Sequence, residues 1–201
     1  MKDLREQYGR RHDQVLVRMA TLLEDHLKDN LSGLPRIDRI SARAKSIDRF
    51  MNKAAKHIDG TLKYSNPLTE IQDQIGARIV TFYLDDVEVI SKEIEAYYRK
   101  IEAQLVVPDS ESEFGYFGKH YILMLPEDIV SDDLDRWLVP KFFELQIKTL
   151  FQHAWSEANH DLGYKPEGEL QSDEKRKIAF TSAQAWGADQ IFAELFRMRN
   201  N

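Results

Sequence analysis

The chain has 201 residues, enough for one domain with a sizeable hydrophobic core, and it is 42% hydrophobic and 31% charged. A mean hydropathy of −0.52 and the lack of any apolar run approaching the ~18 residues of a spanning helix argue against a membrane protein. The net charge of −6 argues against wholesale nucleic-acid binding. The charged start Met1–Glu6 is unlike a secretory signal, and a chain without cysteine has no disulfides, so we expect a cytoplasmic protein.

Helical and strand-like patterns alternate along the chain. Apolar residues at helical spacing predict helices, and alternating or β-branched runs predict strands. In chain order, we predict a helix over 4–29, a strand over 37–44, a basic helix from Ser46 to about Ile58, a strand over 75–83, a helix over 85–98, strands over 105–107, 116–125 and 142–148, a helix over 149–162 and a final helix from Ser172.

These elements predict an α/β (α+β) fold in which a mixed sheet of about five strands is flanked by helices. We expect an N-terminal helix in residues 1–35, a core in 36–165 and a C-terminal helix in 166–201. The apolar residues of the final helix are expected to pack on the core. They are Ile178, Ala183, Trp186, Phe192 and Leu195.

The strand over 142–148 carries an unusual polar face. Side chains alternate along a strand, so Glu144, Gln146 and Lys148 share one face, while Leu145 and Ile147 take the other. An acid, an amide and a base on one face are most often simply solvated. Placed just before a helix, the same set suits a site for a metal and a charged substrate.

A basic segment, Arg36–Lys56, stands out in this acidic chain. At its centre, Arg43 and Lys45 end a strand, Ser46 begins a helix, and Lys53 lies two turns further on. Free N–H groups at a helix start, together with lysines, form a plausible cradle for a polyphosphate. The alternative is a solvated basic helix face.

Two further clusters lie on predicted strands. Asp73, Gly76 and Arg78 open the strand over 75–83, where glycine permits close backbone approach and the acid lies at a strand edge. Tyr116 and His120 are four residues apart, so they share a strand face that suits a stacked base and a contact to its sugar or phosphate. Taken singly, a strand-entry turn and a half-buried Tyr–His pair are the simpler explanations.

The four clusters together resemble, in order and spacing, the motifs of the RelA/SpoT-type synthetases. The matching elements are Arg-x-Lys with the following Ser and Lys, Asp-x-x-Gly-x-Arg, Tyr-x-x-x-His and Glu-x-Gln-x-Lys-Thr, and the resemblance runs from about residue 36 to 196. Three positions depart from the family pattern: Arg49 stands for a serine, Lys148 for an arginine and Asn159 for a glutamate.

The resemblance implies a nucleotidyltransferase-like synthetase fold in which Asp73 and Glu144 bind Mg²⁺ and Glu144 also activates the attacking hydroxyl. It assigns ATP to Arg43, Lys45, Ser46, Lys53 and Arg78, with Arg43 and Arg78 on the two faces of the adenine. It assigns the acceptor to Tyr116, His120, Gln146, Lys148, Asn159 and His160.

The implied reaction moves the β,γ-pyrophosphate of ATP to the 3′-hydroxyl of GDP or GTP, making (p)ppGpp and AMP. Asp109, Glu111 and Glu113 stand where alarmone synthetases carry a Pro-Lys segment, and such acids would repel a free 5′-polyphosphate. This favours the alternative of a toxic relative that modifies the 3′-CCA end of tRNA, with the basic segment on the RNA backbone. A third alternative is an inactive synthetase fold that serves as a regulatory module. A cognate antitoxin and a second copy of the chain stay open as partners, and no membrane partner is expected.

Overall fold

The computed structural model describes residues 2–105, 115, 118–163 and 170–200, and its centre is a mixed sheet of five strands in the order β1-β4-β7-β6-β5. Only β4 and β7 run parallel to each other, and the other neighbours are antiparallel. The predicted fold class is therefore confirmed. The strands are β1 (Ile37–Ala44), β4 (Ile75–Thr81), β5 (Lys100–Leu105), β6 (Lys119–Met124) and β7 (Phe142–Thr149), and β2 (His57–Ile58) and β3 (Thr61–Leu62) form a separate hairpin.

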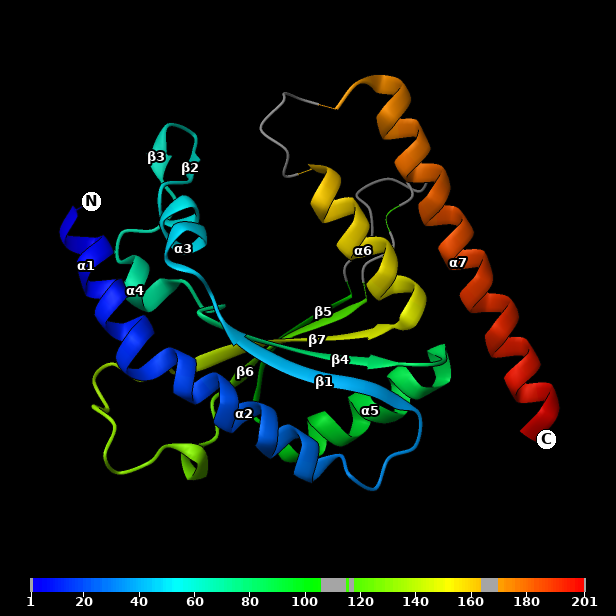
Figure 1. The fold of residues 1–201 in the computed structure, drawn as a ribbon, viewed down its shortest axis with the longest axis horizontal. Helices are drawn as coiled ribbons and strands as arrows, with labels where there is room; N and C mark the ends of the chain where they lie inside the picture. Colours follow the sequence, from blue (N-terminus) through cyan, green and yellow to red (C-terminus); the bar gives the residue numbers. More distant parts are fainter. Residues whose placement is uncertain (1, 106–114, 116–117, 164–169, 201) are drawn as a thin grey trace.

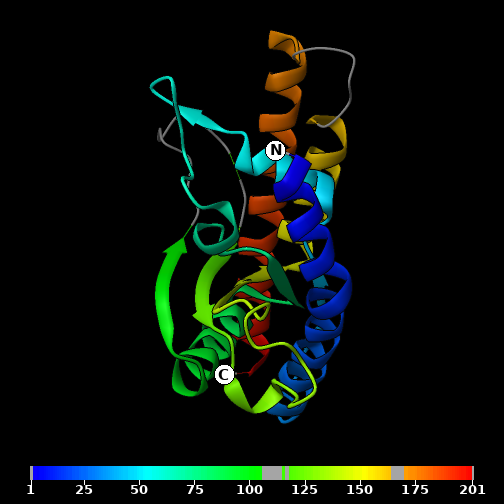
Figure 2. The same ribbon diagram turned by 90° about the vertical axis from the view of Figure 1, so that its left-hand side faces the viewer.

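Helices lie on both sides of this sheet (Figure 1). A long N-terminal helix comprises α1, a π-helical turn η1 and α2, and it runs alongside the sheet in both views (Figures 1 and 2). Within the described residues, no helix is both long and apolar enough to cross a membrane. The helices are α1 (Lys2–Arg11), η1 (His12–Leu16), α2 (Val17–Asn30), α3 (Ile47–Ala54), α4 (Pro67–Glu70), α5 (Leu84–Tyr97), η2 (Glu127–Ile129), α6 (Leu150–Gly163) and α7 (Ser172–Asn200).

One face of the sheet is apolar and forms the core with α2 and α5. Alternation along β4 buries Ile75, Ala77 and Ile79 on that face, against apolar side chains of both helices. Gly76 and Arg78 consequently point to the opposite face, where α3 and α6 rise from the sheet (Figure 1). The polar site lies on this second face because the first is filled by the core.

The predicted helix from Ser46 to about Ile58 is shorter than expected. Ser46 does cap it, since its Oγ accepts a hydrogen bond from the Arg49 N–H at 3.4 Å, but α3 ends at Ala54. The hairpin β2–β3 follows, with positive φ at Asp59 (50°) and Gly60 (79°) in its turn. Asp-Gly is the sequence that such two-residue hairpin turns favour, so the helix prediction was wrong at this point.

The buried stripe of the final helix includes Ser182, Asp189 and Ala193. Of the predicted packing residues, Trp186 and Leu195 are about half exposed, at 48% and 49%, whereas Phe192 stacks on Phe151 of α6 with ring centres 5.7 Å apart. The buried face of α7 includes Asp189 and Ala193, and Asp189 Oδ2 accepts a hydrogen bond from Thr149 Oγ1 at 2.5 Å. A polar anchor and a small residue are therefore fully buried at this contact, while the larger apolar residues Phe192 and Phe196 stack on Phe151 and Tyr83.

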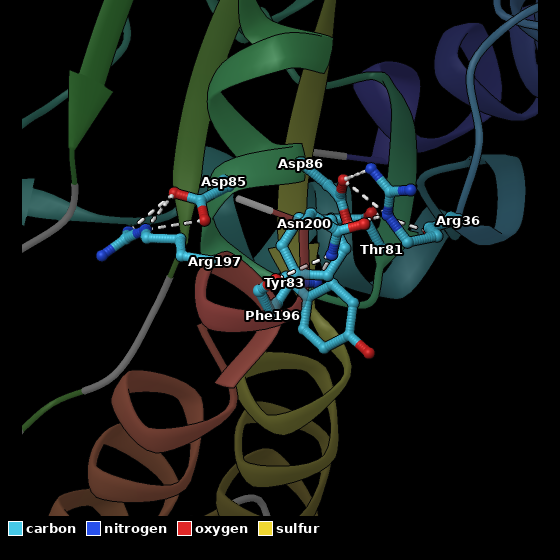
Figure 3. A network of polar contacts seen from close by, with 8 residues as sticks. All are labelled: Arg36, Thr81, Tyr83, Asp85, Asp86, Phe196, Arg197 and Asn200. Atoms are coloured by element: carbon cyan, nitrogen blue, oxygen red, sulfur yellow. Dashed lines mark hydrogen bonds and ion pairs between the residues drawn. The ribbon is translucent and has the colours of Figure 1, made fainter. Parts of the chain in front are cut away.

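The C-terminal end of α7 is fixed by the polar network in Figure 3. Arg36 donates to Asp86 at the start of α5 at 2.7 Å, and its guanidinium carbon lies 4.6 Å from the ring centre of Phe196. Arg197 pairs with Asp85 at 2.7 Å. These contacts join the end of α7 to the residue before β1 and to the β4–α5 junction.

Candidate active site

A cavity of about 280 Å³ opens on the polar face of the sheet. It brings together residues from β1, the start of α3, the start of β4 and the start of β7. Seven predicted site residues line it: Arg43, Lys45, Ser46, Asp73, Arg78, Glu144 and Gln146. These residues are spread over about a hundred positions of sequence. The fold brings them together, as the predicted site requires.

Strand register explains the shape of the cavity. Arg43 lies opposite Gly76 in the antiparallel β1–β4 pair, and Gly76 lies opposite Glu144 in the parallel β4–β7 pair. The three residues form a row whose middle member has no side chain. A Cβ placed on Gly76 would meet no atom within 4 Å, so the gap between the guanidinium and the carboxylate is open space.

Asp73 is held between two lysines at the edge of this cavity. Its Oδ2 lies 2.8 Å from Lys45 Nζ and 2.9 Å from Lys53 Nζ, and its side chain is only 15% exposed. Burial alone would raise the pKa of Asp73, but the hydrogen bonds and charges of the two lysines outweigh it and lower the pKa. Asp73 is therefore an anion at neutral pH, in a strongly cationic setting.

Asp73 and Glu144 fit a magnesium site. Asp73 Oδ1 is buried and has no hydrogen-bond partner in the described part of the chain, and both carboxylates line the same cavity. No group of three His, Cys, Asp or Glu side chains suited to a metal occurs among the described residues. Mg²⁺ is usually held by one or two carboxylates with substrate phosphates completing the shell, so two carboxylates are a sufficient protein contribution.

Arg78 is clamped by two residues of α6 that the sequence patterns did not identify. Its Nη1 lies 2.6 Å from Glu157 Oε1 and 3.1 Å from His153 Nδ1, and its Nη2 donates to Gln146 Oε1 at 3.4 Å. Burial raises the pKa of the Glu157 carboxyl, but the hydrogen bond from Arg78 outweighs it and lowers the pKa. The spacing of His153 and Glu157, one helical turn apart, was the available signal.

Glu144 is oriented by its neighbours on the sheet. Gln146 Nε2 donates to Glu144 Oε2 at 3.1 Å, and His120 Nδ1 lies 3.8 Å from Glu144 Oε1. Burial, with the charges of Lys148 and Arg78, lowers the pKa of His120 to about 4, so the ring is neutral at pH 7. His120 Nε2 is buried without a hydrogen-bond partner among the described residues, which leaves it available to a ligand.

Lys148 lies beneath the polar face rather than in the cavity. It is 4% exposed, its Nζ donates to Ser156 Oγ at 2.9 Å, and burial lowers its pKa to about 8. Gly118 covers it closely, since a Cβ on Gly118 would lie 2.7 Å from Lys148 Cγ.

The other predicted acceptor residues are less close to the cavity. Asn159 and His160 lie near the end of α6, half-buried and exposed respectively, and neither lines the cavity. Tyr116 lies outside the described residues, as do Asp109, Glu111 and Glu113. Of the predicted acceptor residues, His120 and Gln146 lie opposite each other in the β6–β7 register.

The chain is similar to known proteins over most of its length. Residues 42–169 match the family model described as "Region found in RelA / SpoT proteins". The GTP pyrophosphokinase YjbM of Bacillus subtilis (strain 168) is 25% identical over 164 residues, which cover 79% of this chain and 72% of that protein.

Two solved structures of small alarmone synthetase 1 from Bacillus subtilis show the same fold. One superposes with a TM-score of 0.73 at 21% identity, covering 90% of this chain and 94% of the other. The second, bound to its product pppGpp, gives 0.72 at 20% identity, covering 89% and 91%. Since the family model spans more than half of the chain, the protein belongs to the RelA/SpoT family of pyrophosphokinases.

Proposed function

We propose that the protein is a Mg²⁺-dependent enzyme that transfers the β,γ-pyrophosphate of ATP to the 3′-hydroxyl of GDP or GTP, releasing AMP. The observation that carries this proposal is the single cavity shared by Asp73, Glu144, Arg43, Lys45 and Arg78. The similarity to a GTP pyrophosphokinase and to a synthetase bound to pppGpp supports guanosine nucleotides as the acceptors.

The arginines suit the adenine of ATP. Burial and then the nearby charges of Arg49 and Arg78 lower the pKa of Arg43, and all three arginines line the cavity. We assign the two faces of the adenine to Arg43 and Arg78. Planar guanidiniums stack on aromatic faces, and a base inserted between them would also separate their charges. The open space above Gly76 is where we place it.

The lysines suit the phosphates. Lys45 and Lys53 each use one donor on Asp73, and an ammonium has three. Both can therefore keep Asp73 in place while donating to phosphate oxygens. The carboxylate in return holds the two ammonium groups side by side, where a polyphosphate needs them.

Asp73 and Glu144 would hold Mg²⁺, which supplies neutralisation of the charge on the phosphates when bound. Glu144 is also placed to accept the proton of the acceptor 3′-hydroxyl. The acceptor oxygen then forms a bond to the β-phosphorus, and the bond from that phosphorus to the bridging oxygen of the α-phosphate breaks, so AMP leaves. Gln146 keeps the Glu144 carboxylate oriented for this proton transfer.

The 3′-CCA end of tRNA is the second candidate acceptor. The acids Asp109, Glu111 and Glu113 favour it, because they would oppose a free 5′-polyphosphate. The chemistry at Glu144 would be the same, since both acceptors present a ribose 3′-hydroxyl. Only the groups that recognise the rest of the acceptor differ.

One labelling experiment tests the function and the acceptor together. The protein is incubated with γ-³²P-ATP and Mg²⁺ in the presence of GDP, GTP or deacylated tRNA, with Glu144→Gln as the inactive control. Labelled guanosine nucleotide supports the proposal. Label on tRNA alone would show that the acceptor is the 3′-CCA end of tRNA. The absence of transfer to all three acceptors would contradict the enzymatic function.

A further inference from the structure

A second cavity, of about 370 Å³, lies at the junction of α1, α4 and the segment before β7. Its volume lies at the small end of the range for ligand pockets, which suits a compact molecule. It shares no lining residue with the active-site cavity. Its lining includes Gln7, Arg10, Arg11, Asn66, Thr69 and Trp137.

Arg11 is a buried cation in the wall of this cavity. It is 9% exposed, and within the described residues its recorded hydrogen bonds go only to neutral acceptors. These acceptors are the carbonyl of Leu68 at 2.6 Å, the amide oxygen of Gln74 at 3.0 Å and the carbonyl of Trp137 at 3.4 Å. A buried charge is costly unless an opposite charge compensates it, so an anion in the cavity would be stabilised here.

The backbone beside Arg11 is also unusual. The π-helical turn η1 begins at His12, directly after Arg11, and interrupts the long N-terminal helix. Single π-helical turns inside α-helices are uncommon and occur frequently at functional sites. The turn is a second observation that distinguishes this part of the helix, independent of the charge of Arg11.

The rim of the cavity offers a second cation and an aromatic surface. Arg10 is exposed on α1, and Trp137 is 91% exposed, although a tryptophan of this size is usually largely buried. None of the described lining residues is acidic. The Gln7 amide nitrogen donates to Asp3 Oδ2 at 2.9 Å, which leaves the Gln7 amide oxygen for a ligand. Two guanidiniums, two side-chain amides, a hydroxyl and an accessible indole are the groups that recognise a phosphate attached to a planar base.

We propose that this cavity is a second binding site, distinct from the active site, for a nucleoside phosphate. Arg10 and Arg11 bind the phosphate, the base stacks on Trp137, and the amides of Gln7 and Asn66 bind the sugar or the edge of the base. The same chemistry is presented by a free mononucleotide and by an unpaired nucleotide at the end of an RNA.

The test observes Trp137 directly. The chain contains three tryptophans, so protein labelled with 5-fluorotryptophan gives three ¹⁹F signals, of which Trp137→Phe identifies one. Guanosine 5′-monophosphate and the trinucleotide CpCpA are titrated separately. We expect a saturable shift of the Trp137 signal, and the probe with the lower Kd identifies the source of the ligand.

Matched variants separate this site from a general charge effect and from the active site. Arg10→Ala should weaken binding by about tenfold or more, the value of a lost charged hydrogen bond. Arg5→Ala removes the same charge from the same helix outside the cavity and should not change the Kd. Glu144→Gln should also leave the titration unchanged, so the result does not depend on the proposed reaction. No shift of the Trp137 signal with either probe, or an unchanged Kd in Arg10→Ala, would overturn the proposal.

Discussion

Adding a side chain at Gly76 should separate stability from activity. A Cβ there meets no atom within 4 Å, and the backbone is not in the left-handed region that favours glycine. Replacing such a glycine by alanine reduces the entropy of the unfolded chain and stabilises a protein by about 0.4–1 kcal/mol. For a chain of this length, that corresponds to a rise in Tm of roughly 1–4 °C.

The same side chain should block the reaction. It would enter the space between Arg43 and Glu144, where we place the substrate. A misplacement of about 1 Å costs on the order of 100-fold in rate, so Gly76→Ala should lower kcat/KM by about that factor. Gly76→Val, with two further methyl groups in the same space, should lower it further.

The assay combines thermal unfolding with the labelling reaction, and Gly187→Ala is the control. Gly187 also has open space around its Cβ position, but it lies on α7 and does not line the cavity. This control should gain stability and keep full activity. Normal turnover in Gly76→Val would refute the placement of the substrate beside position 76. A marked fall in the Tm of Gly76→Ala would show that a side chain at this position is not accommodated.

Four further predictions concern side chains of the site. Glu144→Gln should keep the fold, as measured by circular dichroism, and lower the rate of pyrophosphate transfer by about 10²–10⁴-fold. Near-normal turnover of this variant would show that Glu144 is not the base. Removal of Mg²⁺ with EDTA should abolish transfer, and Asp73→Asn should raise the Mg²⁺ concentration needed for half-maximal activity; an unchanged requirement would contradict the Asp73 assignment. Glu157→Gln should weaken ATP binding, measured by calorimetry, because Arg78 loses its carboxylate partner, and an unchanged Kd would show that the clamp is not needed. The pKa of His120 is lowered from 6.5 to about 4 in the folded protein. Between pH 4 and 6.5, the His120 ring is therefore protonated mainly in the unfolded chain. Stability should therefore fall as the pH decreases through this window, by up to about 1.4 kcal/mol per pKa unit, and urea unfolding of His120→Asn should show a flatter dependence.

The sequence alone indicated most of the sheet, most of its flanking helices and the resemblance to the family, but it placed β5, which spans Lys100–Leu105, at 105–107. Period-two and helical patterns are local properties, so β1, β4 and β7 and the helices α5, α6 and α7 were predicted close to their observed bounds. Much of the candidate site could also be predicted from the sequence, because Arg43, Asp73 and Glu144 belong to short motifs whose order is typical of the family. Each motif was weak alone, and their succession made them specific.

Only the tertiary structure decided which residues touch. The clamp on Arg78 joins positions 79 apart, and the helical spacing of His153 and Glu157 does not indicate that Arg78 is the residue they contact. Lys148 is closely approached by Gly118, the residue before β6, and α7 is joined to the end of β7 by the contact of Asp189 with Thr149. These features are set by the register of β4, β7 and β6 and by packing between distant segments. Periodicity in the sequence reports which face of an element a residue takes, but it carries no information on what that face meets.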